Sequence, residues 1–184
     1  KSRPSTVWGS RSGLFFDFKP DSDSLDDDSV EATLDTNTFN AITDINSGRD
    51  LQVFTTGGEF YVPQNGMQPI TPTNFFIRSA TKNGSKEGIM TLPLESGTLF
   101  IQRQGKSLNE LRFTDVELSY NIDKISLLSG HLLKTPTTMA LRKAVATDEN
   151  DLLLVTNSDD GSIACYSLLR KNNVIAPSSW TTDG

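Results

Sequence analysis

The sequence contains one cysteine and one histidine, and this scarcity excludes several kinds of chemistry. A single thiol, Cys165, cannot form a disulfide within the chain, and its apolar surroundings predict a buried structural thiol. With His131 as the only histidine, the chain has no Cys/His set at zinc-ligand spacing and no pattern for a nucleophilic cysteine. Phosphate-cradling glycine loops and nucleophile elbows are absent as well. We expect His131 to cap or pack, and we predict no catalytic, cofactor-binding or metal-binding residue.

Long apolar runs and clustered positive charges are also missing. No run approaches the roughly 18 apolar residues that a membrane-spanning helix requires, so we predict no membrane span. Asp and Glu outnumber Lys and Arg by 23 to 17, which gives a net charge of −6. The local concentrations of base, Arg142-Lys143 and Arg170-Lys171, are too small for a phosphate-binding footprint. We therefore expect no measurable binding to duplex DNA at physiological salt.

The length of 184 residues is enough for a substantial core and predicts a single domain over 1–184. The first residues, Lys1-Ser2-Arg3-Pro4, include neither a methionine nor a secretion signal. We therefore expect the chain to be a fragment of a longer protein.

A block of two apolar runs joined by a polar, glycine-containing turn recurs four times. The turn glycines, spaced by roughly 45 to 55 residues, are Gly13, Gly58, Gly105 and Gly161. The flanking runs are 6–8 with 14–16, 51–54 with 60–62, 99–101 with 108–111, and 152–155 with 163–166. Such a period is typical of propeller blades built from antiparallel strands. We therefore predict an all-β fold of about four propeller-like blades in an incomplete propeller.

Other segments complete this prediction. Further strands are expected at 30–34, 41–45, 75–77, 138–147 and 174–180. One helix is expected at about 124–134, where Ile125, Leu128 and Leu132 recur at helical spacing before Pro136. The predicted core residues lie in the apolar runs beside the turns: Trp8, Phe16, Leu51, Phe54, Phe60, Leu99, Ile101, Leu152, Leu154 and Tyr166.

An acidic loop near residues 20–28 is the most obvious candidate site. Asp21 and Asp23 have the first spacing of a calcium loop, but the sixth position is Asp26 instead of glycine and the twelfth is Ala32 instead of glutamate. A solvated loop or a subunit contact is therefore favoured over a tight calcium site. A carboxylate pair for glycoside cleavage can be drawn between Asp26 and Glu31, although any acidic chain offers such pairs. Asn83-Gly84-Ser85 matches a glycosylation acceptor, a motif that is common by chance.

Read in order, the segments resemble the propeller portion of the tail tubular protein B family, the nozzle proteins of short-tailed bacteriophages. The resemblance spans nearly the whole chain and depends on the order and spacing of several short segments. The segments that carry it are 3–13, Asp26-Asp27-Asp28 leading into Val30, 49–51 through 57–60, 70–74, 99–103 running to Glu110-Leu111, His131-Leu132-Leu133, and 180–184.

The resemblance implies a structural virion protein of the phage tail, assembled in the bacterial cytoplasm. Several copies would form a ring below the portal and adaptor proteins, contact the tail fibre proteins, and enclose the channel through which the DNA leaves without specific binding. The family members are longer and have more blades, so ring formation by this chain is an open expectation. No shared catalytic motif carries over, which implies that the chain is not an enzyme.

The alternative is a propeller module that binds or degrades polysaccharide, or binds another ligand, because propellers bind at their channel mouths and fold alone does not fix function. A sugar site needs exposed aromatic platforms. The two tryptophans, Trp8 and Trp180, both lie in predicted strand cores. This placement favours the structural role.

Overall fold

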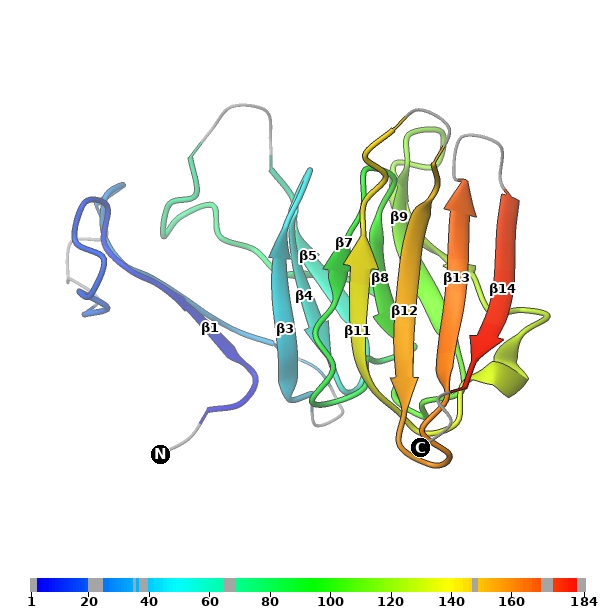
Figure 1. The fold of residues 1–184 in the computed structure, drawn as a ribbon. Helices are drawn as coiled ribbons and strands as arrows, with labels where there is room; N and C mark the ends of the chain where they lie inside the picture. The colour runs from blue at the N-terminus through cyan, green and yellow to red at the C-terminus, as the bar shows by residue number, and fades with distance from the viewer. Residues whose placement is uncertain are drawn as a thin grey trace. The chain divides into compact units, whose positions relative to one another are not determined.

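The computed structural model describes residues 3–19, 25–34, 36, 40–64, 69–146, 149–169 and 174–181. These residues form antiparallel sheets joined by turns and loops (Figure 1), so the predicted all-β class is confirmed. The chain divides into two compact units, Lys1–Lys82 and Asn83–Gly184, each described below by itself. The prediction of a single domain over 1–184 stays a prediction. Among the described residues, no helix is long and apolar enough to span a membrane.

The first unit contains a two-stranded sheet and a four-stranded sheet. The two-stranded sheet pairs β1 (Thr6–Gly9) with β2 (Val30–Thr33). The four-stranded sheet has the order β3 (Ile42–Ser47), β4 (Leu51–Thr55), β5 (Glu59–Val62) and β6 (Arg78–Thr81). One apolar core joins the two sheets and includes Val7, Leu34, Val53, Phe60, Val62 and Phe75.

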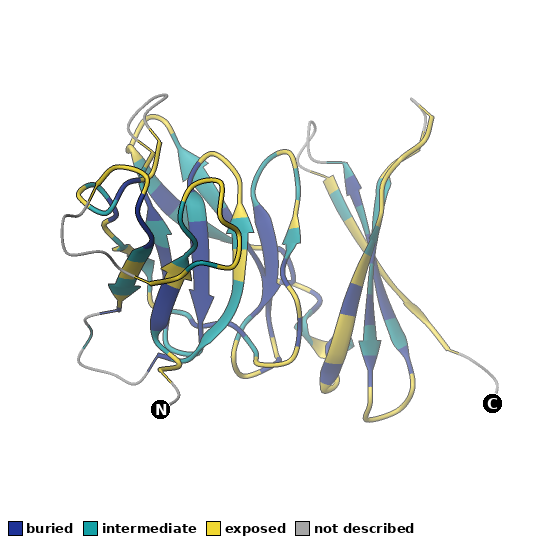
Figure 2. Ribbon diagram, turned by 90° about the vertical axis from the view of Figure 1, so that its left-hand side faces the viewer, coloured by how far each residue is buried: buried dark blue, intermediate teal, exposed yellow. Residues whose placement is uncertain are grey.

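The second unit contains two four-stranded sheets. The first has the order β7 (Leu92–Pro93), β8 (Thr98–Ile101), β9 (Leu108–Thr114) and β10 (Ser119–Lys124). The second has the order β11 (Pro136–Arg142), β12 (Asp151–Asn157), β13 (Ile163–Leu169) and β14 (Val174–Trp180). Side chains from both sheets form one core, which includes Leu99, Ile101, Leu108, Leu153, Val155 and Tyr166. Figure 2 shows the buried residues concentrated in strands and the exposed ones mainly in loops.

Each four-stranded sheet is a meander in which consecutive strands pair, the strand order of a propeller blade. Three of the four predicted hairpins are confirmed: β4 with β5, β8 with β9, and β12 with β13. At two of the turns, the local backbone geometry explains why the residue is glycine. Gly161 has a φ of +67°, which other residues rarely adopt, and a Cβ on Gly58 would lie 2.6 Å from the carbonyl oxygen of Thr81. The arrangement of these sheets as a propeller stays a prediction.

The first predicted hairpin is wrong. The partner of β1 is β2, and Val7 lies opposite Ala32. Gly13 does turn the chain, but a second turn follows immediately because the N–H of Asp17 binds the carbonyl of Leu14. Residues 14–16 therefore form no strand beside β1, and Phe16 is 96% exposed instead of belonging to the core.

The helix predicted at 124–134 is also wrong. Strand β10 pairs with β9 up to Lys124, and the carbonyl of Leu108 then accepts hydrogen bonds from the N–H groups of Ile125 and Ser126. Only Gly130–Leu132 form a short 3₁₀ turn. The start of this segment is therefore hydrogen-bonded to the sheet, and Leu128 of the predicted apolar face is 90% exposed.

The predicted strand positions differ in several places. The strand expected at 75–77 is replaced by β6, which begins at Arg78, and the strand expected at 138–147 is β11, which begins at Pro136 and ends at Arg142. Strands β7 and β8 are joined by a turn in which the N–H of Leu94 donates to the carbonyl of Gly97.

The core prediction is confirmed for Phe54, Phe60, Leu99, Ile101 and Tyr166, all buried. It is wrong for Trp8 and Phe16, which are exposed, while Leu51, Leu152 and Leu154 are only half-buried.

In β12 the core-facing residues are Leu153 and Val155, so the prediction chose the opposite face. Four consecutive apolar residues at 152–155 show no alternation from which the inner face could be read.

Candidate functional site

A cavity of about 470 Å³ opens in the first unit beside Trp8. Its apolar walls come from β1, β2, β3, β4 and the loop before β6: Val7, Val30, Ile45, Leu51, Ile70 and Phe75. Its polar rim consists of two serines, Ser10 and Ser12, and three consecutive carboxylates, Asp26, Asp27 and Asp28. A volume between about 300 and 1,000 Å³, mainly apolar walls and a few converging polar groups are typical of small-molecule sites. We call it the Trp8 cavity.

An ion pair fixes the acidic rim. Arg11 follows β1 and Asp28 precedes β2, so pairing of these strands brings the two residues together. Nη2 of Arg11 lies 2.9 Å from Oδ1 of Asp28, whose side chain is almost fully buried. Oδ2 of Asp28 accepts a 2.7 Å hydrogen bond from the N–H of Leu25. Asp28 is therefore buried, ion-paired through Oδ1 and hydrogen-bonded through Oδ2, although Oδ1 has no hydrogen bond among the described residues.

The other two carboxylates are more available. Nε of Arg11 is 3.8 Å from Oδ2 of Asp27, a looser contact, and the Asp27 side chain is 59% exposed. Asp26 is exposed as well. Three carboxylates therefore face one guanidinium at this rim, which leaves it negatively charged.

Trp8 is among the residues that line the cavity, but the strand register places its side chain on the face of the β1–β2 sheet opposite Val7 and Val30. It is 42% exposed, and Trp180 at the end of β14 is 48% exposed, so the prediction that both tryptophans lie in strand cores is wrong. The physical reason is the same for both: each lies in a two-stranded or edge position where one face has no covering sheet. The exposure of both indoles removes the argument by which their burial disfavoured a sugar-binding role.

A second candidate surface lies on the β11–β14 sheet, on the face opposite the core. Register places alternate residues of each strand there, because side chains along a strand point to opposite faces. Its apolar members are Ala140, Leu152, Leu154, Ile163, Cys165, Leu169, Val174, Ala176 and Trp180, and its polar members are Thr138, Arg142, Thr156, Ser167 and Ser178. We call it the outward face.

The outward face is unusual for the exposed side of an antiparallel sheet. Such a side ordinarily carries polar residues that alternate with core residues. Here Leu152, Leu154 and Ile163 are half-buried and apolar. The charged residue on this face is Arg142 of β11, and it is paired with Glu149. A sheet whose second face is mainly apolar, with a few small polar residues, is expected to have a second partner layer.

The edge strand β14 limits how such a partner can bind. Pro177 lies in the middle of β14, opposite Tyr166. Proline has no N–H to donate and is one of the residues that prevent edge strands from pairing with another chain. Strand addition at the β14 edge is therefore disfavoured, whereas a contact through the outward face needs no edge.

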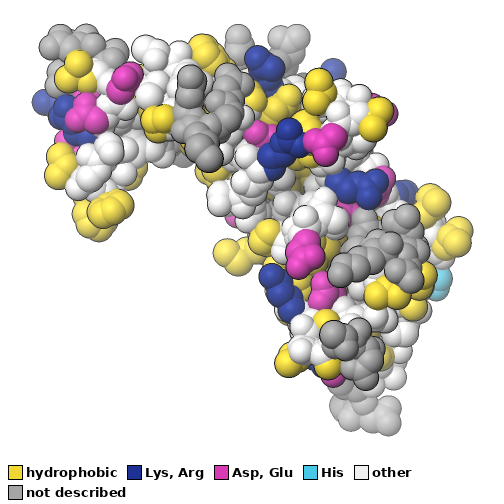
Figure 3. Space-filling view, turned by 90° about the horizontal axis from the view of Figure 1, so that it is seen from above, with side chains coloured by type: hydrophobic (Ala, Val, Ile, Leu, Met, Phe, Trp, Pro, Cys, Tyr) yellow, Lys and Arg dark blue, Asp and Glu magenta, His cyan; other side chains and the backbone are white. Residues whose placement is uncertain are grey.

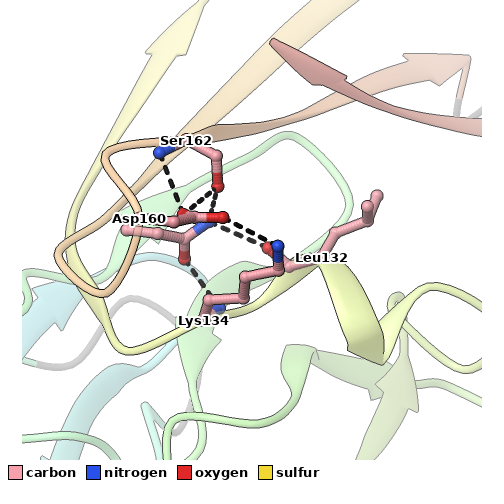
Figure 4. Close-up of polar contacts among 5 residues, drawn as sticks. Leu132, Lys134, Asp160 and Ser162 are labelled. Atoms are coloured by element: carbon pink, nitrogen blue, oxygen red, sulfur yellow. Dashed lines mark hydrogen bonds and ion pairs between the residues drawn. The ribbon is translucent and has the colours of Figure 1, made fainter. Parts of the chain in front are cut away.

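A polar cluster ties the end of β12 to the segment before β11 (Figure 4). Buried Asn157 donates to the carbonyl of Leu132 at 2.9 Å and accepts from the N–H of Lys134 at 2.9 Å. Nζ of Lys134 lies 2.7 Å from Oδ2 of Asp160, while Oδ1 of Asp160 accepts hydrogen bonds from the hydroxyl and the N–H of Ser162 at 2.6 and 3.0 Å.

These contacts have electrostatic consequences. The hydrogen bond from Lys134, together with those from Ser162, holds the pKa of the Asp160 carboxyl well below its usual value, and the same pairing raises the pKa of Lys134. Every group in this cluster has a structural partner, so we assign it to structure and not to ligand binding.

The residues singled out from the sequence are not brought together. Asp21 and Asp23 lie outside the described residues, and no group of three or more His, Cys, Asp or Glu suited to a metal ion occurs in the described ranges. Asp26 is on the cavity rim, whereas Glu31 pairs with Arg3 and does not line the cavity. They do not form the pair proposed for glycoside cleavage.

Of the remaining sequence-based predictions, some are confirmed and others are wrong. Cys165 is a buried free thiol, as predicted. His131 is exposed in the 3₁₀ turn, so the packing role is wrong. Ser85 of the glycosylation motif is buried and bridged to Gln102.

Sequence reasoning missed Arg11 and Asp28 because they are 17 positions apart. The signal that could have found them is the alternation in β2, which marks a strand ready to pair with β1.

No protein-family model matches the chain, and no curated protein matches it.

On the face shown in Figure 3, lysine and arginine side chains are interspersed with acidic ones and form no continuous basic patch.

Proposed function

We propose that the chain is a structural component of a bacteriophage tail, a nozzle-type subunit that forms part of the wall of the DNA ejection channel. Its partners are other copies of itself in a ring, the phage adaptor and tail fibre proteins, and DNA that passes without specific binding. It is assembled in the bacterial cytoplasm and resides in the virion. It is not an enzyme in this proposal.

The observation that carries the proposal is the outward face of the β11–β14 sheet. A blade-like meander with a mainly apolar, almost uncharged second face is what a subunit needs to stack against another sheet. A chain of net charge −6 repels its own copies at most of its surface, whereas this face meets a second copy with little repulsion. The segment resemblance to the tail tubular protein B family supplies the biological setting.

The location of the chain tests the setting. Mass spectrometry of purified virions is expected to detect it in several copies, and electron microscopy of the particle is expected to place it below the portal and adaptor. Portal and adaptor genes beside its gene would agree. Absence of the chain from purified particles would contradict the proposal.

Self-association tests the assembly surface. Sedimentation velocity over a concentration series is expected to show reversible association of the chain, abolished by Ala140→Glu on the exposed part of the outward face. Val116→Glu is the matched control, because it adds the same charge at a 93% exposed position in the turn between β9 and β10. Equal association of both variants would assign the contact to another surface.

A second candidate is the ligand-binding or polysaccharide-acting module, and the Trp8 cavity supports it. The cavity combines apolar walls, a volume suited to a small ligand and several polar lining groups. Saturable binding of a small molecule that perturbs Trp8, by a chain that is absent from virions, would favour this candidate.

A further inference from the structure

We propose that the turn at residues 14–17 of one copy of the chain docks onto the outward face of the β11–β14 sheet of a second copy. The proposal rests on the assembly role stated above and names the second surface of that contact. A ring of subunits requires two different surfaces on each subunit, because a contact between two identical patches joins only a pair. The outward face is one of these surfaces, and the 14–17 turn is the other.

The 14–17 turn carries two aromatic side chains at its corner. The N–H of Asp17 donates to the carbonyl of Leu14 at 3.0 Å, so Phe15 and Phe16 are the two central residues of the turn. Such positions are usually occupied by glycine, proline, asparagine, aspartate or serine. Both rings are exposed and add nothing to the core of their unit. A local rule broken without a gain for the fold indicates a functional position.

The backbone of the turn is fixed before any partner binds. The N–H of Leu14 donates to the carbonyl of Arg11 at 3.0 Å, and the N–H of Arg11 donates to the carbonyl of Asp17 at 2.8 Å, so two consecutive turns close into one loop. The N–H of Ser12 donates to the carbonyl of Asp27 at 2.9 Å and ties this loop to a second segment. A preorganised backbone lowers the entropic cost of binding.

The exposed aromatic area suits the anchor of a reversible contact. Phe15, Phe16 and Phe18 are 79%, 96% and 48% exposed. An aromatic side chain buries about 150 to 250 Å² when it is fully covered, so these three can bury roughly 350 to 550 Å². Each partner in a standard interface buries about 800 Å². The rings therefore supply about half of one side of an interface, and aromatic side chains are the usual anchors there.

The outward face offers a matching apolar surface. Leu152, Leu154 and Ile163 are half-buried, so part of each side chain remains for a partner to cover. Ala140 lies opposite Leu154 and is exposed, and its small side chain leaves space for a ring beside the leucine.

The charges of the two surfaces are compatible. The segment 17–28, which includes the end of the turn, contains six aspartates and one lysine. On the outward face the charged residue is Arg142, whose side chain stays 56% exposed beside its partner Glu149, and Lys143 follows it in the sequence. The acidic segment therefore meets less repulsion here than at the rest of a chain of net charge −6.

Single variants test the role of the turn. Phe16→Glu is expected to leave the full chain monomeric in sedimentation velocity, at concentrations where the Val116→Glu control associates as the unchanged chain does. Phe16→Ala is expected to weaken the association at least about tenfold, as for an interface anchor. Position 16 is 96% exposed, so both variants are expected to keep the melting temperature of the unchanged chain.

A mixture of two variants tests whether the surfaces bind each other. Ala140→Glu keeps the turn intact and Phe16→Glu keeps the outward face intact, and each alone is expected to be monomeric. A 1:1 mixture is expected to form a dimer and nothing larger, because one intact turn and one intact face remain for each pair.

The outcomes separate the turn from the assembly surface itself. If Ala140→Glu associates as strongly as Val116→Glu, the assembly role of the outward face and the docking of the turn are both wrong. If Ala140→Glu is monomeric while Phe16→Glu associates normally, the outward face keeps its role and the docking of the turn is wrong. A mixture that stays monomeric when both single variants are monomeric also overturns the docking of the turn.

Discussion

Leu153 of β12 lies directly opposite Tyr166 of β13, and neither side chain has exposed surface. The pair occupies the middle of the core shared by the two sheets of the second unit. The pair therefore fixes which face of the β11–β14 sheet is the inner one. Leu154, its sequence neighbour, consequently belongs to the outward face.

This relationship predicts unequal costs for two chemically identical substitutions. Leu153→Ala is expected to lower the free energy of unfolding by about 2 to 5 kcal/mol, because it leaves a cavity in a closed core. Leu154→Ala is expected to cost clearly less, since its side chain is half-buried. Urea denaturation of both variants measures the difference, and a larger loss for Leu154→Ala would reverse the assignment of the faces.

Two phenylalanines of the first unit provide a second test. Phe54 is fully buried and Phe16 is 96% exposed. Phe54→Ala is expected to cost about 3 to 5 kcal/mol, and Phe16→Ala is expected to stay within about 0.5 kcal/mol of the unchanged chain. Thermal and chemical denaturation measure both. A melting temperature unaffected by Phe54→Ala would contradict the burial of this side chain.

Asn157 is expected to be the costliest polar substitution among those at the end of β12. Asn157→Ala removes the partners of the Lys134 N–H and the Leu132 carbonyl, and buried groups left unpaired typically cost about 1 to 3 kcal/mol. Hydrogen exchange of the Lys134 amide is expected to accelerate as well. Asn150→Ala is the control, because Asn150 is exposed and donates only to Ser167 at 3.1 Å. Similar losses for both variants would show that the Asn157 contacts are not stabilising.

The Asp160 contacts predict a pH dependence. The pKa of Asp160 is lowered in the folded chain by its hydrogen bonds with Lys134 and Ser162, so the contribution of this carboxylate is present above its usual pKa of 3.8 and is lost as pH falls through the lower, folded value. The pKa of Lys134 is raised above its usual 10.5, so the pairing is also lost as pH rises through that raised value.

Asp160→Asn is therefore expected to lower stability near neutral pH and to make no difference in strong acid. Carbon chemical shifts of the Asp160 carboxyl, followed against pH, are expected to give a midpoint below 3.8. Asp159→Asn serves as a comparison, because Asp159 acts on Lys134 through its charge alone. A midpoint for Asp160 at or above 3.8 would mean that the contacts with Lys134 and Ser162 do not persist in solution.

The sequence was informative where turn chemistry and hydrophobic pattern agreed. Around Gly161, an Asp-Asp-Gly turn between two apolar runs specifies the hairpin of β12 and β13 without help from distant residues. At Gly13 the same local signal was present, but the partner of β1 was β2, and pairing across an intervening loop leaves no local mark.

The candidate site was hidden for the same reason. Trp8, Ile45 and Asp27 come together only through sheet packing and through the pairing of β1 with β2. The helix predicted at 124–134 is wrong for a different reason. The spacing of its apolar residues fits a helix, but Ile125 and Ser126 at its start are hydrogen-bonded to Leu108 of β9. Tertiary hydrogen bonding then overrides a short apolar period.

The meander order of the sheets also bears on how the chain folds. Every strand in the described sheets pairs only with strands that precede or follow it directly in sequence. Short loops close at low entropic cost, and native contacts that are local in sequence form faster than distant ones. Each sheet can therefore complete its hydrogen bonding on the ribosome once its last strand has emerged, without waiting for later segments to be synthesised.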